Sequence, residues 1–287
     1  MSSEAAPAGT PAERVHLRRL VLIWALLTVV GVLLIVFVAG PHMPPGNFSV
    51  QARDQRHINI LLAALAVPVL FAVWTCLVYI FSSFRQRGEE LVDGPPDKGR
   101  AGLQIAWVIA TAVIVLALAA LGTDELLGSA KGAGGGQGPS PLVVPAGQKL
   151  QVQVIGQQWA WTFRYPAYGG VETPELALPA GQTAELHVTS LDVAHSFWAI
   201  QLGVKADAIP GSDNVTFVDP RHTGSFEIRC AELCGLWHGH MHNTGVVMTP
   251  AAFASWISRQ QALNAPATKT LPPYSTHYFP DPVRRAG

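Results

Sequence analysis

Charged residues are scarce in this chain of 287 residues, and the two signs balance. Lys and Arg number 19, Asp and Glu also number 19, and charged residues make up only 13% of the sequence. A formal net charge of zero argues against a broad basic surface, so no nucleic-acid partner is expected. The low charge and the mean hydropathy of +0.28 are typical of a membrane protein that carries a soluble extension.

Cysteine is also rare. Three cysteines are too few for a disulfide scaffold. Cys76 lies inside an apolar run and is expected to be a small core residue. The other two, Cys230 and Cys234, are only four positions apart. Their proximity indicates a local chemical role, which the neighbouring residues help to define.

The stretch from Cys230 to Met241 holds two thiols, the imidazole of His238 and a thioether. Soft sulfur ligands together with imidazole favour copper, and a single-copper site of the blue type needs only one cysteine. Here there is a thiolate to spare, and two bridging thiolates can hold two copper ions side by side. A further imidazole must come from elsewhere, and His195 is the obvious donor.

Three other interpretations of this stretch remain open. Cys230 and Cys234 could form a disulfide. With His238 and either His240 or His242, they could bind a structural zinc ion. The spacing could also describe one face of a helix. The thioether of Met241, the separate His195 and the strand-like flanks all favour copper.

The pattern Cys-x3-Cys-Gly-x2-His-x2-Met, with Asp-x2-His-Ser-Phe-Trp upstream, resembles the binuclear copper A site of subunit II of cytochrome c oxidase. The resemblance is dense from Leu150 to Val247 and loose in the membrane part. It implies membrane α-helices followed by an all-β domain, a cupredoxin-like Greek-key β-barrel or sandwich on a transmembrane helical anchor. Several short strand-like runs agree with such a sandwich or barrel.

The resemblance also implies a role for each candidate ligand. Cys230 and Cys234 would bridge the two coppers, His195 and His238 would each bind one, and Met241 would be a weak axial ligand. The backbone carbonyl of Glu232 would complete the other copper, and its side chain would reach a magnesium ion at the interface with the catalytic subunit. His240 and His242 are outside the family pattern and are expected to lie beside the site or on the surface.

Electron entry is the role that the resemblance implies for Trp159, at the docking surface for cytochrome c. Trp161 and Phe163 are expected to pack in the core, and His187 is expected to face solvent. A weak acidic rim for a basic partner is predicted at Glu172, Glu175, Asp192, Asp207, Asp213 and Asp219.

Three uncharged runs are long enough to cross a bilayer, which takes about 20 apolar residues. The predicted spans are 18–40, 57–84 and 101–122, after a cytoplasmic tail at 1–17. The first span remains open between a retained helix, which its length favours, and a signal peptide. Basic residues before the first run and between the second and third place the N-terminus inside. A multi-pass protein of the bacterial plasma membrane is therefore expected, with its copper domain on the periplasmic face.

The rest of the chain divides by composition. A flexible linker is predicted at 123–144, the copper domain at 145–263 and an irregular tail at 264–287. Within the domain, buried positions change parity at Ile155-Gly156, which predicts a β-bulge. A short helix is expected at 250–261, with Phe253, Trp256 and Ile257 on one face.

One departure from the family pattern concerns protons. Gln104 stands where the family often has a glutamate near a proton entry path. The expected function is electron entry from cytochrome c, or from a fused or membrane-bound cytochrome c, into a haem–copper subunit I that reduces oxygen. A copper A subunit of a nitric oxide reductase and a membrane-anchored copper-binding or assembly protein are the alternatives.

Overall fold

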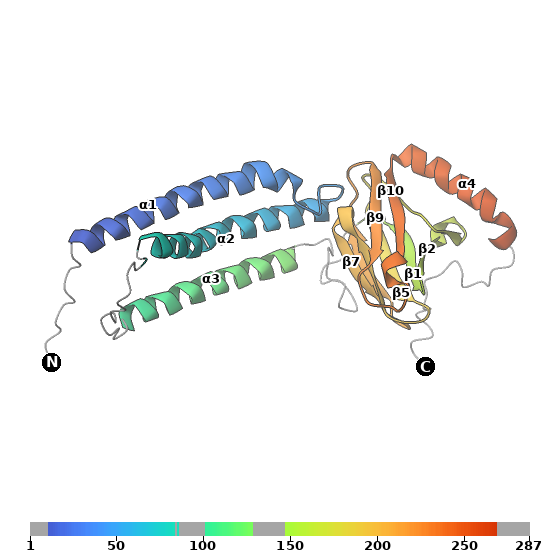
Figure 1. Cartoon of the computed structure of the whole chain (residues 1–287). Helices are drawn as coiled ribbons and strands as arrows, with labels where there is room; N and C mark the ends of the chain where they lie inside the picture. Colours follow the sequence, from blue (N-terminus) through green and yellow to red (C-terminus); the bar gives the residue numbers. More distant parts are fainter. Residues whose placement is uncertain (1–10, 84, 86–100, 129–146, 269–287) are drawn as a thin grey trace. The chain divides into compact units, whose positions relative to one another are not determined.

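The computed structural model describes residues 11–83, 85, 101–128 and 147–268 (Figure 1). Apolar helices precede two five-stranded β-sheets and a final helix. The predicted order of long apolar α-helices followed by an all-β sandwich is confirmed. The chain divides into two compact units, Met1–Met43 with His57–Ile109, and Pro44–Arg56 with Ala110–Gly287.

Three helices in the described part of the chain are long and apolar enough to cross a membrane. They are α1 (Pro11–Leu34), α2 (Val50–Ser83) and α3 (Ala101–Gly128). A π-helical turn (Ile35–Ala39) and a 3-10 turn (Gly40–His42) continue α1. Large apolar side chains cover the outer surfaces of these helices, as expected where lipid or a partner helix replaces water.

Close contacts join α1 to α2. A Cβ atom on Gly31 would lie 2.5 Å from the ring of Phe71, so the small residue lets the two helices approach. The indole Nε1 of Trp24 donates a hydrogen bond to the Pro68 carbonyl at 2.8 Å. His16 and Tyr79 are hydrogen-bonded at 2.7 Å. These contacts hold α1 and α2 side by side.

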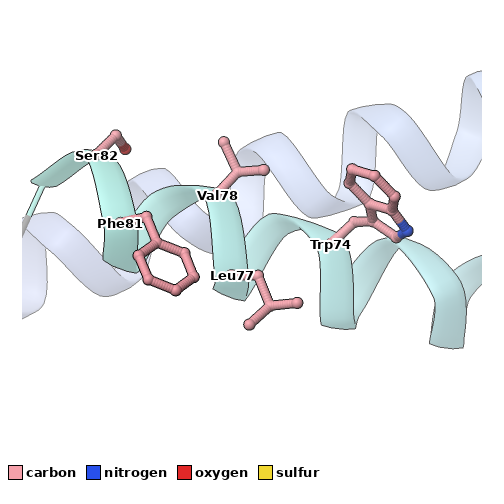
Figure 2. Close-up of a pocket in the computed structure, with 5 residues that line it drawn as sticks. All are labelled: Trp74, Leu77, Val78, Phe81 and Ser82. Atoms are coloured by element: carbon pink, nitrogen blue, oxygen red, sulfur yellow. The ribbon is translucent and has the colours of Figure 1, made fainter.

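One face of α2 forms an open apolar groove near its C-terminal end (Figure 2). Its lining side chains recur at helical spacing: Trp74, Leu77, Val78, Phe81 and Ser82. Such a surface is suited to contact with acyl chains or another membrane helix.

The second unit contains the two β-sheets. The first has the strand order β3-β2-β1-β5-β8 and the second has the order β4-β10-β9-β6-β7. The first sheet consists of β1 (Leu150–Gln157), β2 (Ala160–Tyr165), β3 (Val171–Thr173), β5 (Ala184–Ser190) and β8 (Asn214–Val218). The second consists of β4 (Leu176–Pro179), β6 (His195–Ala199), β7 (Val204–Ala208), β9 (Gly224–Cys230) and β10 (His242–Met248).

A hairpin replaces the predicted bulge at Ile155-Gly156. β1 is continuous to Gln157 and pairs with β2 in an antiparallel register, Gly156 opposite Trp161. The chain reverses at Gln158 and Trp159, so buried positions change parity because the strand direction changes. A bulge and a tight turn both invert parity in the sequence, which is why the prediction was wrong.

Buried side chains from both sheets form one core, closed on one side by α4 (Pro250–Thr268). Phe253, Trp256 and Ile257 of α4 are buried, as predicted. The hydroxyl of Tyr165 bonds both the N–H and the C=O of Ala177, and so joins the two sheets. Trp161 and Phe163 are fully buried, which confirms their predicted packing role.

The segment that begins α2 packs against the sandwich within the second unit. Ser49 Oγ accepts the Ala52 N–H, which caps the helix, and donates to the Leu202 carbonyl. Val50 N–H donates to the Asp219 carbonyl at 3.1 Å. Gly203, at φ +64°, lies against the backbone of Ala52. A Cβ atom added to Gly203 would be only 2.8 Å from the Cα atom of Ala52.

Several elements extend beyond their expected limits. α2 begins at Val50, before the predicted span, because Ser49 caps it. α3 continues to Gly128, so the first part of the predicted linker is helical; residues 129–144 lie outside the described residues. α4 continues to Thr268, and the remainder of the predicted irregular tail also lies outside them.

Candidate metal centre

Two loops at one end of the sandwich hold the predicted ligands. His195 begins β6, and Cys230 ends β9. Antiparallel pairing of β6 with β9 sets Phe197 opposite Cys230. His195, two residues before Phe197, therefore lies close to Cys230. Cys234 lies in the loop that follows β9, and His238 starts a 3-10 turn (His238–His240) just before Met241.

Donor atoms from all these residues converge. Cys230 Sγ lies 3.8 Å from Cys234 Sγ and 3.9 Å from His195 Nδ1. Cys234 Sγ lies 3.5 Å from His238 Nδ1 and 3.8 Å from Met241 Sδ. The Glu232 carbonyl oxygen is 3.2 Å from Cys230 Sγ. The ligand atoms of His195, Cys230 and Cys234 all lie within 4.8 Å of one another.

This geometry bears on the alternative interpretations. The sulfur separation of 3.8 Å is far longer than a disulfide bond of about 2.05 Å, and both cysteines are free thiols. The segment is a loop and a 3-10 turn, so it is not one face of an α-helix. A structural zinc site uses four donors, whereas six donor atoms converge here. The sulfur-rich set therefore fits copper better than zinc.

Burial has a clear electrostatic consequence. Burial is the main reason that the pKa of the Cys234 thiol is raised to about 12, and the neighbouring Cys230 contributes to this increase. Without a metal, the Cys234 thiol is therefore neutral near pH 7. Binding of copper by thiolates must release protons, so affinity for the metal is expected to rise with pH.

The remaining polar residues near the centre follow the predictions in part. His240 and His242 are both exposed and lie outside the cluster, and the His240 ring lies tilted against Trp237 with ring centroids 5.2 Å apart. The Glu232 side chain is exposed and free of the copper ligands, while its carbonyl points to Cys230. Met241 is buried.

Trp159 contacts the loop that carries Cys234. Its indole Nε1 donates to the Cys234 carbonyl at 3.2 Å, and Gln158 Nε2 donates to the same oxygen at 2.8 Å. The side chain of Trp159 is partly buried and packs against the core. Trp159 is therefore adjacent to a candidate ligand through a single hydrogen bond.

Gly156 is a residue whose role the sequence interpretation missed. A Cβ atom there would lie 3.1 Å from the His195 ring and 3.0 Å from the Trp161 ring. The glycine therefore allows His195 to pack closely on β1. An isolated glycine inside a strand often marks such a close approach, which was the available signal.

Two predictions about polar residues are wrong. His187 is buried instead of facing solvent, because Asp213 accepts at 2.9 Å from its Nδ1 and Glu185 lies 3.3 Å from its Nε2. These partners offset the cost of burying the ring. Asp219 is buried and hydrogen-bonded to Thr183, so it cannot belong to a docking rim.

Other acids of the predicted rim have partners within the chain. Glu172 pairs with Arg164, and Asp192 binds His195. Apolar side chains instead dominate the exposed surface of the metal-binding loops. Leu233 and Leu236 are 79% and 86% exposed, and Leu191 and Trp237 are also more than half exposed. Apolar groups so exposed mark a candidate contact surface for a partner.

Comparisons with known proteins identify the family of this chain. Residues 172–248 match the family model described as cytochrome c oxidase subunit II, periplasmic domain. The chain is 30% identical to cytochrome c oxidase subunit 2 of Thermostichus vulcanus, over 87% of this chain and 89% of that protein. The corresponding protein of Synechocystis sp. is also 30% identical, over 83% of this chain and 82% of its own length.

A solved structure is also similar. The periplasmic domain of subunit II of cytochrome oxidase from Bradyrhizobium japonicum is 32% identical, with a TM-score of 0.40. The similarity covers 42% of this chain and 99% of that domain.

Proposed function

Because this chain belongs to the cytochrome c oxidase subunit II family, whose members are subunits of an oxidoreductase complex, we propose that it is the electron-entry subunit of a haem–copper oxidase. It would accept electrons from cytochrome c at a binuclear copper A centre. It would pass them to subunit I, which reduces oxygen to water. The observation that carries this proposal is the convergence of six donor atoms, two of them thiol sulfurs 3.8 Å apart.

Each residue has a proposed task at the centre. Cys230 and Cys234 would hold the copper ions through their thiolates, and His195 and His238 would supply one imidazole each. Met241 and the Glu232 carbonyl would complete the donor set. When bound, a copper pair supplies a one-electron redox centre. A packed β-scaffold resists distortion, so these residues hold nearly the same positions in both redox states.

The donor set leaves no open position for a substrate, so oxygen chemistry belongs to the partner. The exposed Glu232 carboxylate is a proposed magnesium ligand at the interface with subunit I. We place the centre on the periplasmic side of a bacterial plasma membrane, with the N-terminus in the cytoplasm, because the basic residues flank the opposite ends of the helices.

Electron entry is proposed at the apolar surface of the metal-binding loops, beside Trp159. Leu233, Leu236 and Trp237 would exclude water from the contact with cytochrome c. An apolar contact leaves a smaller role for acids than the predicted rim, since most of those acids already have partners in the chain. Reduction by cytochrome c is then expected to depend only weakly on ionic strength.

Metal content tests the proposal directly. The full chain, purified in detergent and loaded with copper, should bind two copper ions and turn purple. Cys230→Ser should abolish the colour, because a hydroxyl is too hard a ligand to replace a bridging thiolate. Cys76→Ser is the matched control, since Cys76 lies in α2 and outside the cluster. One zinc ion per chain after purification would refute the copper assignment.

A further inference from the structure

Asp192 lies in the loop between β5 and β6 and accepts hydrogen bonds from two sides. Its Oδ1 is 2.9 Å from His195 Nε2 and 2.6 Å from the Val193 amide nitrogen. Its Oδ2 is 2.7 Å from the Gln158 amide nitrogen. Ser190 Oγ also donates to Oδ1, at 3.3 Å. Asp192, which was predicted to belong to a docking rim, is therefore hydrogen-bonded to residues beside the candidate ligands.

The chemistry of these contacts assigns the proton on His195. Backbone N–H groups can only donate, so both carboxylate oxygens act as acceptors. Oδ1, which already accepts the Val193 N–H, can also accept from His195, so this contact forms when His195 Nε2 carries the hydrogen. The lone pair of His195 Nδ1 is then directed toward Cys230 Sγ, 3.9 Å away.

The second contact of Asp192 leads to the other thiol. The backbone N–H of Gln158 donates to Asp192 Oδ2, and the Gln158 side chain donates to the Cys234 carbonyl at 2.8 Å. Trp159, the next residue, donates to the same carbonyl. One carboxylate thus connects the ring of His195 with the turn that supports Cys234.

We propose that Asp192 is a positioning residue of the metal centre, which holds His195 in its Nε2–H tautomer and holds the Gln158–Trp159 turn against Cys234. The inference rests on the proposed copper function for its role in metal binding. Its effect on the tautomer of His195 is independent of any metal. Carboxylates that orient a ligating imidazole contribute about 10- to 100-fold to metal affinity in other proteins.

Two variants and one control test the proposal in the full chain. Asp192→Ala removes both contacts. Asp192→Asn keeps an oxygen that can accept from His195, but its NH2 group then faces the Gln158 N–H, donor against donor. Asp213→Ala is the matched control, because it removes an Asp–His contact of the same 2.9 Å length at His187, outside the cluster.

Copper affinity, measured by competition with a chelator, is the first readout. We expect a loss of about 10- to 100-fold for Asp192→Ala, a smaller loss for Asp192→Asn and no change for Asp213→Ala. The second readout is 15N NMR of the copper-free chain labelled at histidine. His195 should be a single Nε2–H tautomer in the wild type and a mixture of tautomers in Asp192→Ala.

The outcomes separate this inference from the proposed function. Failure of the wild type to bind copper would refute the copper function, while the tautomer of His195 would still test Asp192. The positioning role would be overturned if the wild type binds copper and Asp192→Ala keeps both the same copper affinity and a single His195 tautomer. An equal loss of affinity in Asp213→Ala would also overturn it, by showing a general effect on the fold.

Discussion

At the residue scale, the absence of a side chain matters as much as the ligands do. Gly156 lies in β1, and a Cβ atom added there would lie 3.0 Å from the Trp161 ring and 3.1 Å from the His195 ring. His195 is fully buried, so its ring has little room to move aside. Packed interiors respond to one added methyl group by shifting the neighbours or by straining them. The position of a candidate ligand therefore depends on a residue that touches no metal.

Gly156→Ala should displace the His195 ring by a few tenths of an ångström and lower copper affinity on the order of tenfold. The altered ligand geometry should also change the visible spectrum of the loaded protein. Gly239→Ala is the matched control, because Gly239 lies between His238 and His240 but a Cβ there meets nothing within 4 Å. Identical spectra for the two variants would contradict this account of Gly156.

Trp159→Ala should slow reduction by cytochrome c and leave the copper spectrum intact. The spectrum is expected to survive because Gln158 Nε2 still donates to the Cys234 carbonyl when the indole is absent. Stopped-flow reduction of the loaded chain measures the rate. Trp198→Ala, at a 39% exposed tryptophan of β6, controls for the loss of a surface indole. A wild-type rate in Trp159→Ala would make Trp159 a packing residue only.

At the element scale, the start of α2 and the sandwich form one packed unit. The backbone of Ser49 to Ala52 contacts the turn after β6 and the strand end at Asp219, with Ser49 as the helix cap. Gly203 permits this contact in two ways. Its φ of +64° favours glycine, and an added Cβ would clash with the backbone of Ala52 at 2.8 Å.

Gly203→Ala should therefore loosen the contact between the start of α2 and the sandwich. Gly181→Ala is the control, since Gly181 has φ +81° but open space around its Cβ position. Both variants incur the cost of a left-handed alanine, about 1–2 kcal/mol. Only Gly203→Ala should also speed hydrogen exchange at the Val50 amide, which bonds Asp219. Equal exchange rates in the two variants would show that the clash is relieved without opening the contact.

At the scale of the whole molecule, the described chain combines a cluster of candidate metal ligands with apolar helices long enough to cross a membrane. Gln104 lies on α3 and cannot release a proton, so it cannot act as an acid on a proton path in the proposed complex. A haem-bearing subunit I would supply both the oxygen site and that path.

The complex purified through a tag on this chain should consume oxygen with reduced cytochrome c, in a reaction that cyanide inhibits. The loss of activity in Cys230→Ser, with the partner still bound, would locate electron entry in this chain. Turnover of nitric oxide with negligible oxygen uptake would assign the chain to a nitric oxide reductase instead. A preparation without a haem-bearing partner would favour the copper-binding or assembly function.

Local patterns in the sequence predicted the kinds of structure and most of the candidate ligands. Apolar runs of sufficient length predicted three membrane helices, because the bilayer sets the required length. The short spacing from Cys230 to Met241 predicted a soft metal site, since those side chains can converge without help from distant segments. The closing helix was predicted for a similar reason, because its buried positions follow one helical face.

Tertiary structure decided what depends on residues far apart in the chain. Pairing of β6 with β9 brings His195 to the thiols, and the β1–β2 hairpin brings Gly156 and Trp159 beside them. The sequence could not distinguish that hairpin from a bulge, because both invert the parity of buried positions. Asp192 and His187 show the same limit. Whether a polar side chain faces solvent or a buried partner depends on which loop the fold places next to it.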